Sequence, residues 1–351
     1  MKTIHINTAS KNYDVVIGGG LIEKAAELLP HKKAATAAIV SDDNVAPLYC
    51  DKLENALKTI GLRVVRFVFH AGESSKNPDT LIELLTFLAE SRLTRSDMLF
   101  ALGGGVTGDM AGLAAALYMR GIPLVQLPTT LLSAVDSSVG GKTAIDLKNG
   151  KNLVGAFYQP NLVICDTAAL DTLPSAEIAN GNAEIVKYAA IRDASLLDII
   201  HEPDRRDELI ARCVSIKNDV VSEDEHDTGL RQLLNFGHTF GHAIEKLSNY
   251  STPHGNAVAI GMVIITNACV KKGICPAETL DILVDALKKC GLPTSANYTA
   301  EEMFDTVLSD KKRASDHITL VIPEYFGNCV LKKCTLEETF DLLKTGLEEE
   351  I

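Results

Sequence analysis

The stretch Asp97-Met-Leu-Phe-Ala-Leu-Gly-Gly-Gly-Val-Thr-Gly-Asp109 sets the first expectation about the fold. Its first half is mostly apolar, as in a buried strand, and the Ala-rich residues 110–119 that follow have the composition of a helix. Gly103, Gly105 and Gly108 match the pattern GxGxxG between these two elements. Such glycines let a pyrophosphate approach the backbone, and the free N–H groups at the helix start face its charge. The stretch therefore favours a dinucleotide-binding α/β fold, although glycine-rich turns also arise for tight packing alone.

Short β-rich runs alternate with helical patterns over the first half of the chain. We predict strands at residues 36–41, 62–69, 97–102, 123–127 and 162–165, and residues 1–8 alternate like a further strand. From about Ser175 onward we predict helices at residues 176–191, 230–247, 256–272 and 277–289. These patterns predict an N-terminal Rossmann-like α/β domain with a mostly parallel sheet, residues 1–172, and an all-α C-terminal domain, residues 173–351.

Charge and cysteine content narrow the class of partner and the compartment. The 351 residues include 34 Lys and Arg against 46 Asp and Glu, a net charge of −12. This balance argues against nucleic acid and anionic membranes as partners, because Lys and Arg supply most of the affinity for both. The eight Cys form no CxxC pair, which is typical of reduced core thiols. Because the sequence has neither a signal-peptide pattern nor an apolar run of transmembrane length, we expect a cytoplasmic protein.

The glycine-rich turn lacks one part of the usual dinucleotide pattern. An acid about 20 residues further on normally holds the ribose, but residues 124–130 read Leu-Val-Gln-Leu-Pro-Thr-Thr. Asp42 and Asp43, which follow the predicted strand 36–41, are the candidate substitutes. The same two acids are equally typical of a solvated loop or a helix cap.

A second glycine-bearing turn carries several cations. Its segment Gly140-Gly-Lys142-Thr143 ends like a P-loop, but Asp136 stands where that motif needs its leading glycine, so a kinase or ATPase is a weak interpretation. The turn suits an anionic small molecule, and an ordinary basic loop is the alternative. Its polar residues are Asp136, Lys142, Lys148, Lys151 and Asn152.

The segment 231–245 carries the strongest sign of chemistry. Arg231, Asn235, His238 and His242 are spaced +4, +3 and +4, which on one helix predicts a continuous polar stripe. Apolar residues cover much of the rest of that helix, so the stripe is expected to be buried and to need partners. Gly237 and Gly241 are then mid-helix glycines, which persist where a backbone or a ligand must come very close.

Two of these side chains belong to a candidate metal site. His238 and His242 lie four residues apart, His254 stands in a predicted loop, and Glu184 shares a predicted helix face with Asn180 and Lys187. A lone histidine on an apolar helix is usually a hydrogen-bonded core residue. Two histidines and a carboxylate, in contrast, leave an open coordination position, as in a catalytic zinc site.

Taken together, these segments resemble the 3-dehydroquinate synthase family, NAD- and metal-dependent cyclases of the shikimate pathway that leads to aromatic amino acids. The resemblance extends over nearly the whole chain. It is carried by residues 103–112, 118–146, 150–160, 170–174, 180–191, 229–245, 254–262 and 309–312.

The resemblance implies a set of functional residues. It implies that Glu184, His238 and His254 bind zinc or cobalt, with His242 unligated near the substrate. It implies NAD contacts from Asp42, Asp43, Asn44, Glu73, Lys76, Gly104, Gly105, Val106, Asp109, Thr129, Thr130, Lys142 and Lys151. It implies substrate-site roles for Asp136, Lys142, Lys151, Asn152, Lys187, Lys217, Arg231, Asn235, His242 and one of Lys311 and Lys312. Arg120 matches an arginine that reaches the neighbouring subunit, which implies a homodimer.

The implied reaction is that of a lyase. The substrate, 3-deoxy-D-arabino-heptulosonate 7-phosphate, is oxidised transiently at C5 by NAD and loses phosphate. Re-reduction, ring opening and an internal aldol closure then give 3-dehydroquinate. The Lys142, Lys151 and Lys187 group is expected to hold the phosphate, and Lys217, Arg231 and Asn235 the carboxylate. His242, assisted by Asp136, is expected to relay a proton.

Three alternatives are weighed against this interpretation. Another sugar phosphate cyclase would keep NAD, metal and phosphate elimination. A metal-dependent alcohol or glycerol dehydrogenase would share the two-domain plan but would not need the lysine set. A non-catalytic NAD-binding paralogue would not need to retain every ligand and cation.

Overall fold

The computed structural model describes residues 1–29, 34–311 and 316–348, which fall into two compact units. Unit 1 comprises Met1–Pro174 and Arg206–Glu225. Unit 2 comprises Ser175–Arg205 and His226–Ile351. Each unit has its own secondary structure and is described by itself.

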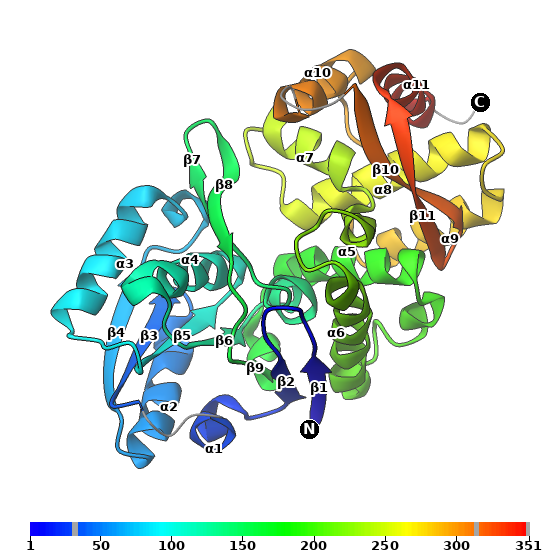
Figure 1. The fold of residues 1–351 in the computed structure, drawn as a ribbon. Coiled ribbons are helices and arrows are strands. Elements are labelled where there is room, and N and C mark those ends of the chain that lie inside the picture. The colour runs from blue at the N-terminus through cyan, green and yellow to red at the C-terminus, as the bar shows by residue number, and fades with distance from the viewer. Residues whose placement is uncertain (30–33, 312–315, 349–351) are drawn as a thin grey trace. The chain divides into compact units, whose positions relative to one another are not determined.

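Unit 1 is built on a seven-stranded sheet with the strand order β1-β2-β9-β6-β5-β3-β4 (Figure 1). β1 is antiparallel to β2, and the other neighbours are parallel. All the predicted strands are present, and the five internal ones differ from the expected ends by at most one residue. The sheet consists of β1 (Lys2–Ile6), β2 (Tyr13–Gly18), β3 (Thr36–Asp42), β4 (Arg63–Phe69), β5 (Met98–Gly103), β6 (Leu124–Pro128) and β9 (Leu162–Asp166), of which β2 was not predicted.

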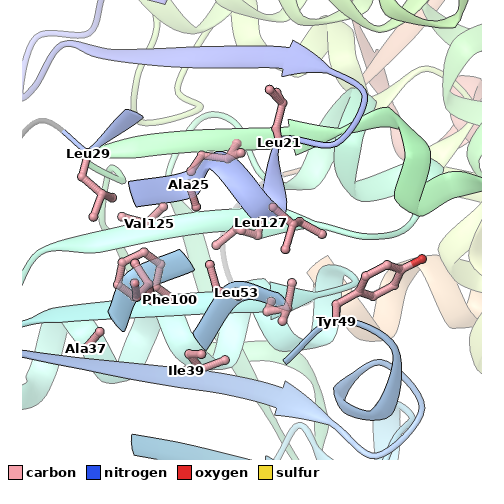
Figure 2. Packing of buried hydrophobic residues seen from close by; sticks show 14 of the residues in the cluster. Leu21, Ala25, Leu29, Ala37, Ile39, Tyr49, Leu53, Phe100, Val125 and Leu127 are labelled. Carbon is pink, nitrogen blue, oxygen red and sulfur yellow. The ribbon is translucent and has the colours of Figure 1, made fainter. Parts of the chain in front are cut away.

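Helices cover both faces of this sheet because alternate residues of its central strands point to opposite sides. On β3, Ile39 packs in one apolar cluster, while Ala38 and Val40 belong to another. Figure 2 shows the first cluster, in which Phe100 of β5 and Leu53 of α2 take part. Four of the covering helices are α1 (Ala25–Leu28), α2 (Ala46–Thr59), α3 (Pro78–Glu90) and α4 (Gly105–Leu117). This doubly wound arrangement confirms the predicted α/β class.

A separate antiparallel hairpin carries the basic turn of unit 1. It consists of β7 (Lys142–Leu147) and β8 (Gly150–Phe157), and it packs on α3 and α4 (Figure 1). The predicted lysine-bearing turn is therefore partly strand, with Lys142 at the start of β7 and Lys151 and Asn152 at the start of β8.

The boundary between the units is crossed more than once, unlike the single boundary at residue 172 expected from the sequence. Helix α6 (Arg206–Glu223) follows the start of unit 2 in the chain but packs on β1 and β2 in unit 1. Thr167 donates a hydrogen bond to Asp207, and Glu225 accepts hydrogen bonds from Ser10 and Gln159. These long-range partners are invisible to a composition-based boundary.

Unit 2 is mostly helical. Its main helices are α5 (Ser175–Ile191), α7 (His238–Leu247), α8 (His254–Lys271), α9 (Ala277–Lys289), α10 (Ala300–Lys311) and α11 (Leu336–Leu347). The prediction of an all-α domain missed one element, the antiparallel hairpin of β10 (His317–Tyr325) and β11 (Asn328–Thr335). Alternate residues Ile318, Leu320 and Ile322 of β10 are buried, a pattern that the sequence interpretation overlooked.

The predicted helix 230–247 is wrong as a single element. Leu230–Asn235 form a 3₁₀ helix, and the chain breaks at Gly237 (φ 77°) before α7 begins at His238. A left-handed backbone at this position ends one helix and starts the next, and glycine adopts it without steric cost. Arg231 and Asn235 therefore do not share one helical stripe with His238 and His242.

The glycines of this region serve a close approach between α7 and α8. A Cβ atom at Gly261 would lie 2.0 Å from the carbonyl oxygen of Gly237, and one at Gly241 would lie 3.0 Å from that of Ala257. The sequence predicted that a neighbouring backbone or a ligand comes close to these glycines, and the backbone of α8 does so. His254 begins this helix instead of standing in a loop, which corrects the predicted start of the helix at residue 256.

All eight cysteines are free and buried, as the sequence predicted. Among the helices of the described residues, none is long and apolar enough to cross a membrane. Burial raises the pKa of Cys269 to about 12 and that of Cys290 to about 11. These thiols stay protonated in the folded chain at pH values where the unfolded chain ionises them.

We therefore expect stability to fall in alkali. Below about pH 9 the buried thiols contribute fully to the free energy of unfolding. Above that pH only the unfolded thiols ionise, so each buried thiol lowers the free energy of unfolding by up to ~1.4 kcal/mol per pH unit. Urea unfolding of the reduced protein at pH 8 and pH 10 measures this loss. Cys269→Ala should give a shallower pH dependence, whereas the matched variant Thr266→Ala, at another fully buried position of α8, should keep the wild-type slope.

Candidate functional site

The glycine-rich turn lies where a parallel sheet binds its ligands. β5 ends at Gly103 and α4 begins at Gly105, so the free N–H groups of the helix start face the carboxyl end of the strands. A Cβ atom at Gly103 would lie 2.4 Å from the hydroxyl of Thr107, and one at Gly104 would lie 3.0 Å from Thr130. Of the described residues, none pairs with the buried hydroxyl of Thr129. This cradle and orphaned donor fit a dinucleotide.

The two candidate ribose acids already have local partners. Asp42 accepts hydrogen bonds from the backbone N–H groups of Asn44 and Val45 and from the hydroxyl of Thr107. Asp43 accepts from the backbone N–H of Ala71, and this hydrogen bond, together with His70, lowers the pKa of its carboxyl. Both acids lie at the carboxyl end of β3, beside β5. Asp42 closes the turn before α2 without capping that helix, whose N-cap is Val45 with no side-chain hydrogen bond, and its ribose contact stays a proposal.

A charged cluster on unit 1 surrounds Lys76. Its buried ammonium donates to Asp109 at 2.7 Å and to Asn152 at 2.6 Å, and Glu73 lies 4.0 Å away. Glu73 also pairs with Lys151 at 3.5 Å. Burial alone would lower the pKa of Lys76, but the charges of Asp109 and Glu73 raise it above its ordinary value, so the lysine stays charged. Five residues that the resemblance implies, from three separate segments of the chain, thus meet.

A second ion pair of unit 1 joins residues far apart in the sequence. Lys217 of α6 donates to the carboxylate of Asp136 and, at 2.7 Å, to its backbone carbonyl. Asp136 sits on a turn, Ser133–Ser137, between β6 and β7. The remaining predicted residues of unit 1 lie elsewhere. Lys142 is exposed, and Val106 and Thr130 flank the glycine turn. Arg120 is exposed and has a left-handed backbone (φ 64°).

Unit 2 brings the three predicted metal ligands together. Glu184 of α5, His238 of α7 and His254 of α8 offer ligand atoms that all lie within 4.8 Å of one another. Oε1 of Glu184 is 3.6 Å from Nε2 of His238 and 3.5 Å from Nε2 of His254. Two ligands of a tetrahedral ion, each at about 2.1 Å, stand roughly 3.4 Å apart. The donor set and its spacing fit a divalent metal.

The surroundings of His238 and His254 shift the pKa values of the two imidazole rings in opposite directions. Burial, followed by the charge of Lys187, lowers the pKa of His238 well below its ordinary value. Burial would also lower that of His254, but the hydrogen bonds that its ring donates to Glu184 and Glu245 raise its pKa to about 10. The metal-free chain therefore carries a proton on His254 that metal binding must displace.

The remaining predicted residues of unit 2 lie on the elements around this group. Lys187 is buried one turn after Glu184 and pairs with its carboxylate. Arg231 is buried and Asn235 half-buried on the 3₁₀ helix, and the His242 side chain is 52% exposed. Lys311 ends α10, and Lys312 lies outside the described residues.

One residue of this group was not singled out from the sequence. Glu245, three residues after His242 on α7, is buried beside His254 and His242, and together these form a second grouping of possible ligands. The i, i+3 spacing to His242 placed both on one helix face. The approach of His254 from α8 could not be derived from that spacing.

Comparisons with known proteins identify the family to which the chain belongs. The family model described as 3-dehydroquinate synthase N-terminal matches residues 66–180, and the one described as 3-dehydroquinate synthase C-terminal matches residues 181–313. The 3-dehydroquinate synthase of Clostridium acetobutylicum is 40% identical over 98% of this chain and 99% of its own. The chain belongs to the 3-dehydroquinate synthase family.

Solved structures of related sugar phosphate cyclases share the fold of this family member. A 2-deoxy-scyllo-inosose synthase complexed with carbaglucose-6-phosphate, NAD⁺ and Co²⁺ is 26% identical, with a TM-score of 0.88 over 98% of this chain and 99% of that one. ValA, the 2-epi-5-epi-valiolone synthase of Streptomyces hygroscopicus subsp. jinggangensis 5008, with NAD⁺ and Zn²⁺ bound, is 28% identical. Its TM-score is 0.86 over 95% of this chain and 96% of that one.

We expect His254→Ala to abolish stable zinc binding, because it removes one of the three clustered donors. His201→Ala is the matched control, since His201 is exposed and lies outside both groupings. The measurement is the zinc content of each variant after dialysis. Equal zinc content in the two variants would contradict the ligand assignment.

Proposed function

We propose that the chain catalyses the 3-dehydroquinate synthase reaction, converting 3-deoxy-D-arabino-heptulosonate 7-phosphate to 3-dehydroquinate and phosphate. The observation that carries the proposal is the assembly of Glu184, His238 and His254 in a chain that matches a curated 3-dehydroquinate synthase over almost its full length. Family membership names the reaction, and the assembled donors supply part of the chemistry it needs.

NAD is the proposed redox cofactor, held by unit 1. When bound there, it would supply reversible hydride chemistry at C5 of the substrate with no net oxidation. The glycine cradle at residues 103–105, the unpaired hydroxyl of Thr129 and the charged cluster around Lys76 support this assignment. We assign the remaining cofactor contacts to Asp42, Asp43, Asn44, Glu73, Val106, Asp109, Thr130, Lys142 and Lys151.

A single zinc or cobalt ion is the proposed metal, held by Glu184, His238 and His254. When bound, it supplies Lewis-acid chemistry that makes the C5 alkoxide accessible near neutral pH. The chain's own part is to keep His238 neutral by burial and to orient the ligand rings. The carbonyl oxygen of Phe236, 3.1 Å from Nδ1 of His238, accepts a hydrogen bond from Nδ1–H, and Nε2 of the ring faces Glu184.

The cations hold the two anionic ends of the substrate in our proposal. We assign the phosphate to Lys142, Lys151 and Lys187 and the carboxylate to Lys217, Arg231 and Asn235. Fixing both ends orients the reacting carbons, which lowers the entropic part of the barrier. Asn152, Arg120 and one of Lys311 and Lys312 complete the substrate set.

His242 is the proposed proton relay, with Asp136 assisting. Its side chain is 52% exposed, and its ring centroid lies 5.5 Å from that of His238. An accessible imidazole beside the metal ligands can take a proton from the substrate and pass it to solvent near neutral pH.

A second candidate activity is that of another sugar phosphate cyclase. The fold similarity to 2-deoxy-scyllo-inosose synthase, with a TM-score of 0.88, favours it over unrelated NAD enzymes. The higher identity to 3-dehydroquinate synthase, 40% against 26%, favours the carboxylated substrate.

Phosphate release from the heptulosonate phosphate tests the proposal. The zinc-loaded protein should release phosphate with only trace NADH at steady state, and chelator should suppress the release. His201→Ala should retain wild-type turnover, and His254→Ala should lose it. Release of no phosphate by the loaded protein, or stoichiometric NADH, would exclude the proposed reaction and favour a dehydrogenase.

We also propose a homodimer formed through unit 1. Exposed apolar side chains gather on the β7–β8 hairpin at Leu147, Leu153, Val154 and Phe157, with further ones at Leu117 and Met119 beside Arg120. β8 packs on α4, which ends at Leu117. Exposed apolar patches of this kind commonly mark protein interfaces.

Leu153→Glu should shift the protein toward monomer, because it places a charge in the apolar patch. Ile82→Glu on α3 is the matched control, since both side chains are 60% exposed. Sedimentation velocity at several concentrations measures the assembly. A dimer that both variants preserve, or a wild-type monomer, would contradict the proposed interface.

The compartment that we propose is reducing, as the cytoplasm is. The eight buried free thiols support it, because such thiols are typical of proteins kept reduced.

A further inference from the structure

A carboxylate outside the three proposed ligands lies directly behind one of them. Glu245 of α7 is 5% exposed, and its Oε2 lies 3.4 Å from Nδ1 of His254. The other ring nitrogen of His254, Nε2, lies 3.5 Å from Oε1 of Glu184. Two carboxylates therefore face opposite nitrogens of one imidazole.

We propose that Glu245 is a positioning residue, which fixes His254 as a metal ligand by accepting the hydrogen bond of its Nδ1–H. With that proton held on Nδ1, the lone pair of Nε2 points toward the position shared with Glu184 and His238. Carboxylates placed behind ligating histidines fix the tautomer and raise the basicity of the ligand. This inference rests on the metal site proposed above.

The two histidine ligands are oriented by different means. His238 is held through the backbone carbonyl of Phe236, which no side-chain substitution removes. His254 is the first residue of α8, and its Nδ1 faces the carboxylate of the Glu245 side chain. Glu245 reaches it because α7 and α8 approach closely at Gly241. The orientation of His254 is therefore open to a direct test.

A rival role for Glu245 is that of ligand to a second ion. His242, Glu245 and His254 form a grouping of their own, with Oε2 of Glu245 4.0 Å from Nε2 of His242. Ions at both sites would require His254 to give up both ring protons, since each of its nitrogens would bind one ion. Orientation of a single ligand needs no such loss.

The test compares Glu245→Ala and Glu245→Gln with two controls. Glu184→Gln alters a proposed ligand, and Glu301→Gln alters an exposed carboxylate on α10. Zinc affinity is measured by competition with a chromophoric chelator, and the visible spectrum of the cobalt-loaded protein reports the coordination geometry. Thermal unfolding of the metal-free variants shows whether each one folds.

We expect Glu245→Ala to weaken zinc binding about 10–100-fold and to change the cobalt spectrum. Glu245→Gln should lose a smaller but measurable part of this affinity, because its neutral amide oxygen still accepts the hydrogen bond but no longer raises the basicity of the ring. This variant keeps the test decisive if the alanine variant does not fold. Glu301→Gln should match the wild type.

Wild-type zinc affinity and an unchanged cobalt spectrum in a folded Glu245→Ala or Glu245→Gln variant would overturn the positioning role. Two zinc ions per wild-type chain, with one in Glu245→Gln, would overturn it in favour of a second ligand site. If Glu184→Gln also leaves zinc affinity unchanged, the metal site itself is wrong, and the fault lies with the proposed function.

Discussion

The close approach of α7 and α8 is the constraint on which the metal-ligating group depends. Gly261 and Gly237 leave no room between the two helices for even one methyl group. His238 starts one helix and His254 the other, so this distance decides whether their rings can reach the same point. The side-chain oxygen of Asn180 on α5 accepts a hydrogen bond from the backbone N–H of Gly255. This bond links the start of α8 to the helix that carries Glu184. The three donors are thus positioned by helix packing, and the rings need only small adjustments.

The fold of unit 1 could be predicted from the sequence because its signals are local. Each strand is a short apolar run bounded by turn residues, and the glycine turn at residue 103 stands between a strand and a helix. The addition of α6 to this unit could not be predicted, since it depends on contacts of Asp207 and Lys217 with residues more than 35 positions earlier in the chain. Local composition carries no information about such partners.

In the candidate site, too, local patterns could be predicted from the sequence and contacts between distant segments could not. The i, i+4 pair His238 and His242, together with His254 and Glu184, was enough to suggest a metal. The role of Gly237 was misjudged, because a glycine inside a helical pattern can be either a packing residue or a helix break, and only the backbone angle distinguishes them. Glu245 was passed over because its partner comes from another helix. The resemblance to a family named the ligands, and the structure supplied their distances.

The break at Gly237 places neighbouring residues on two elements that can vary independently. Arg231 and Asn235 lie on a short 3₁₀ segment, whereas His238 lies on the next helix with its own packing against α8. If Arg231 and Asn235 contact the substrate as proposed, a substitution on the first segment alters that contact without tilting the helix that carries His238. The proposed substrate segment can therefore vary separately from the helices that carry the proposed metal ligands, and the related cyclases that share this fold at 26–28% identity bear different product names.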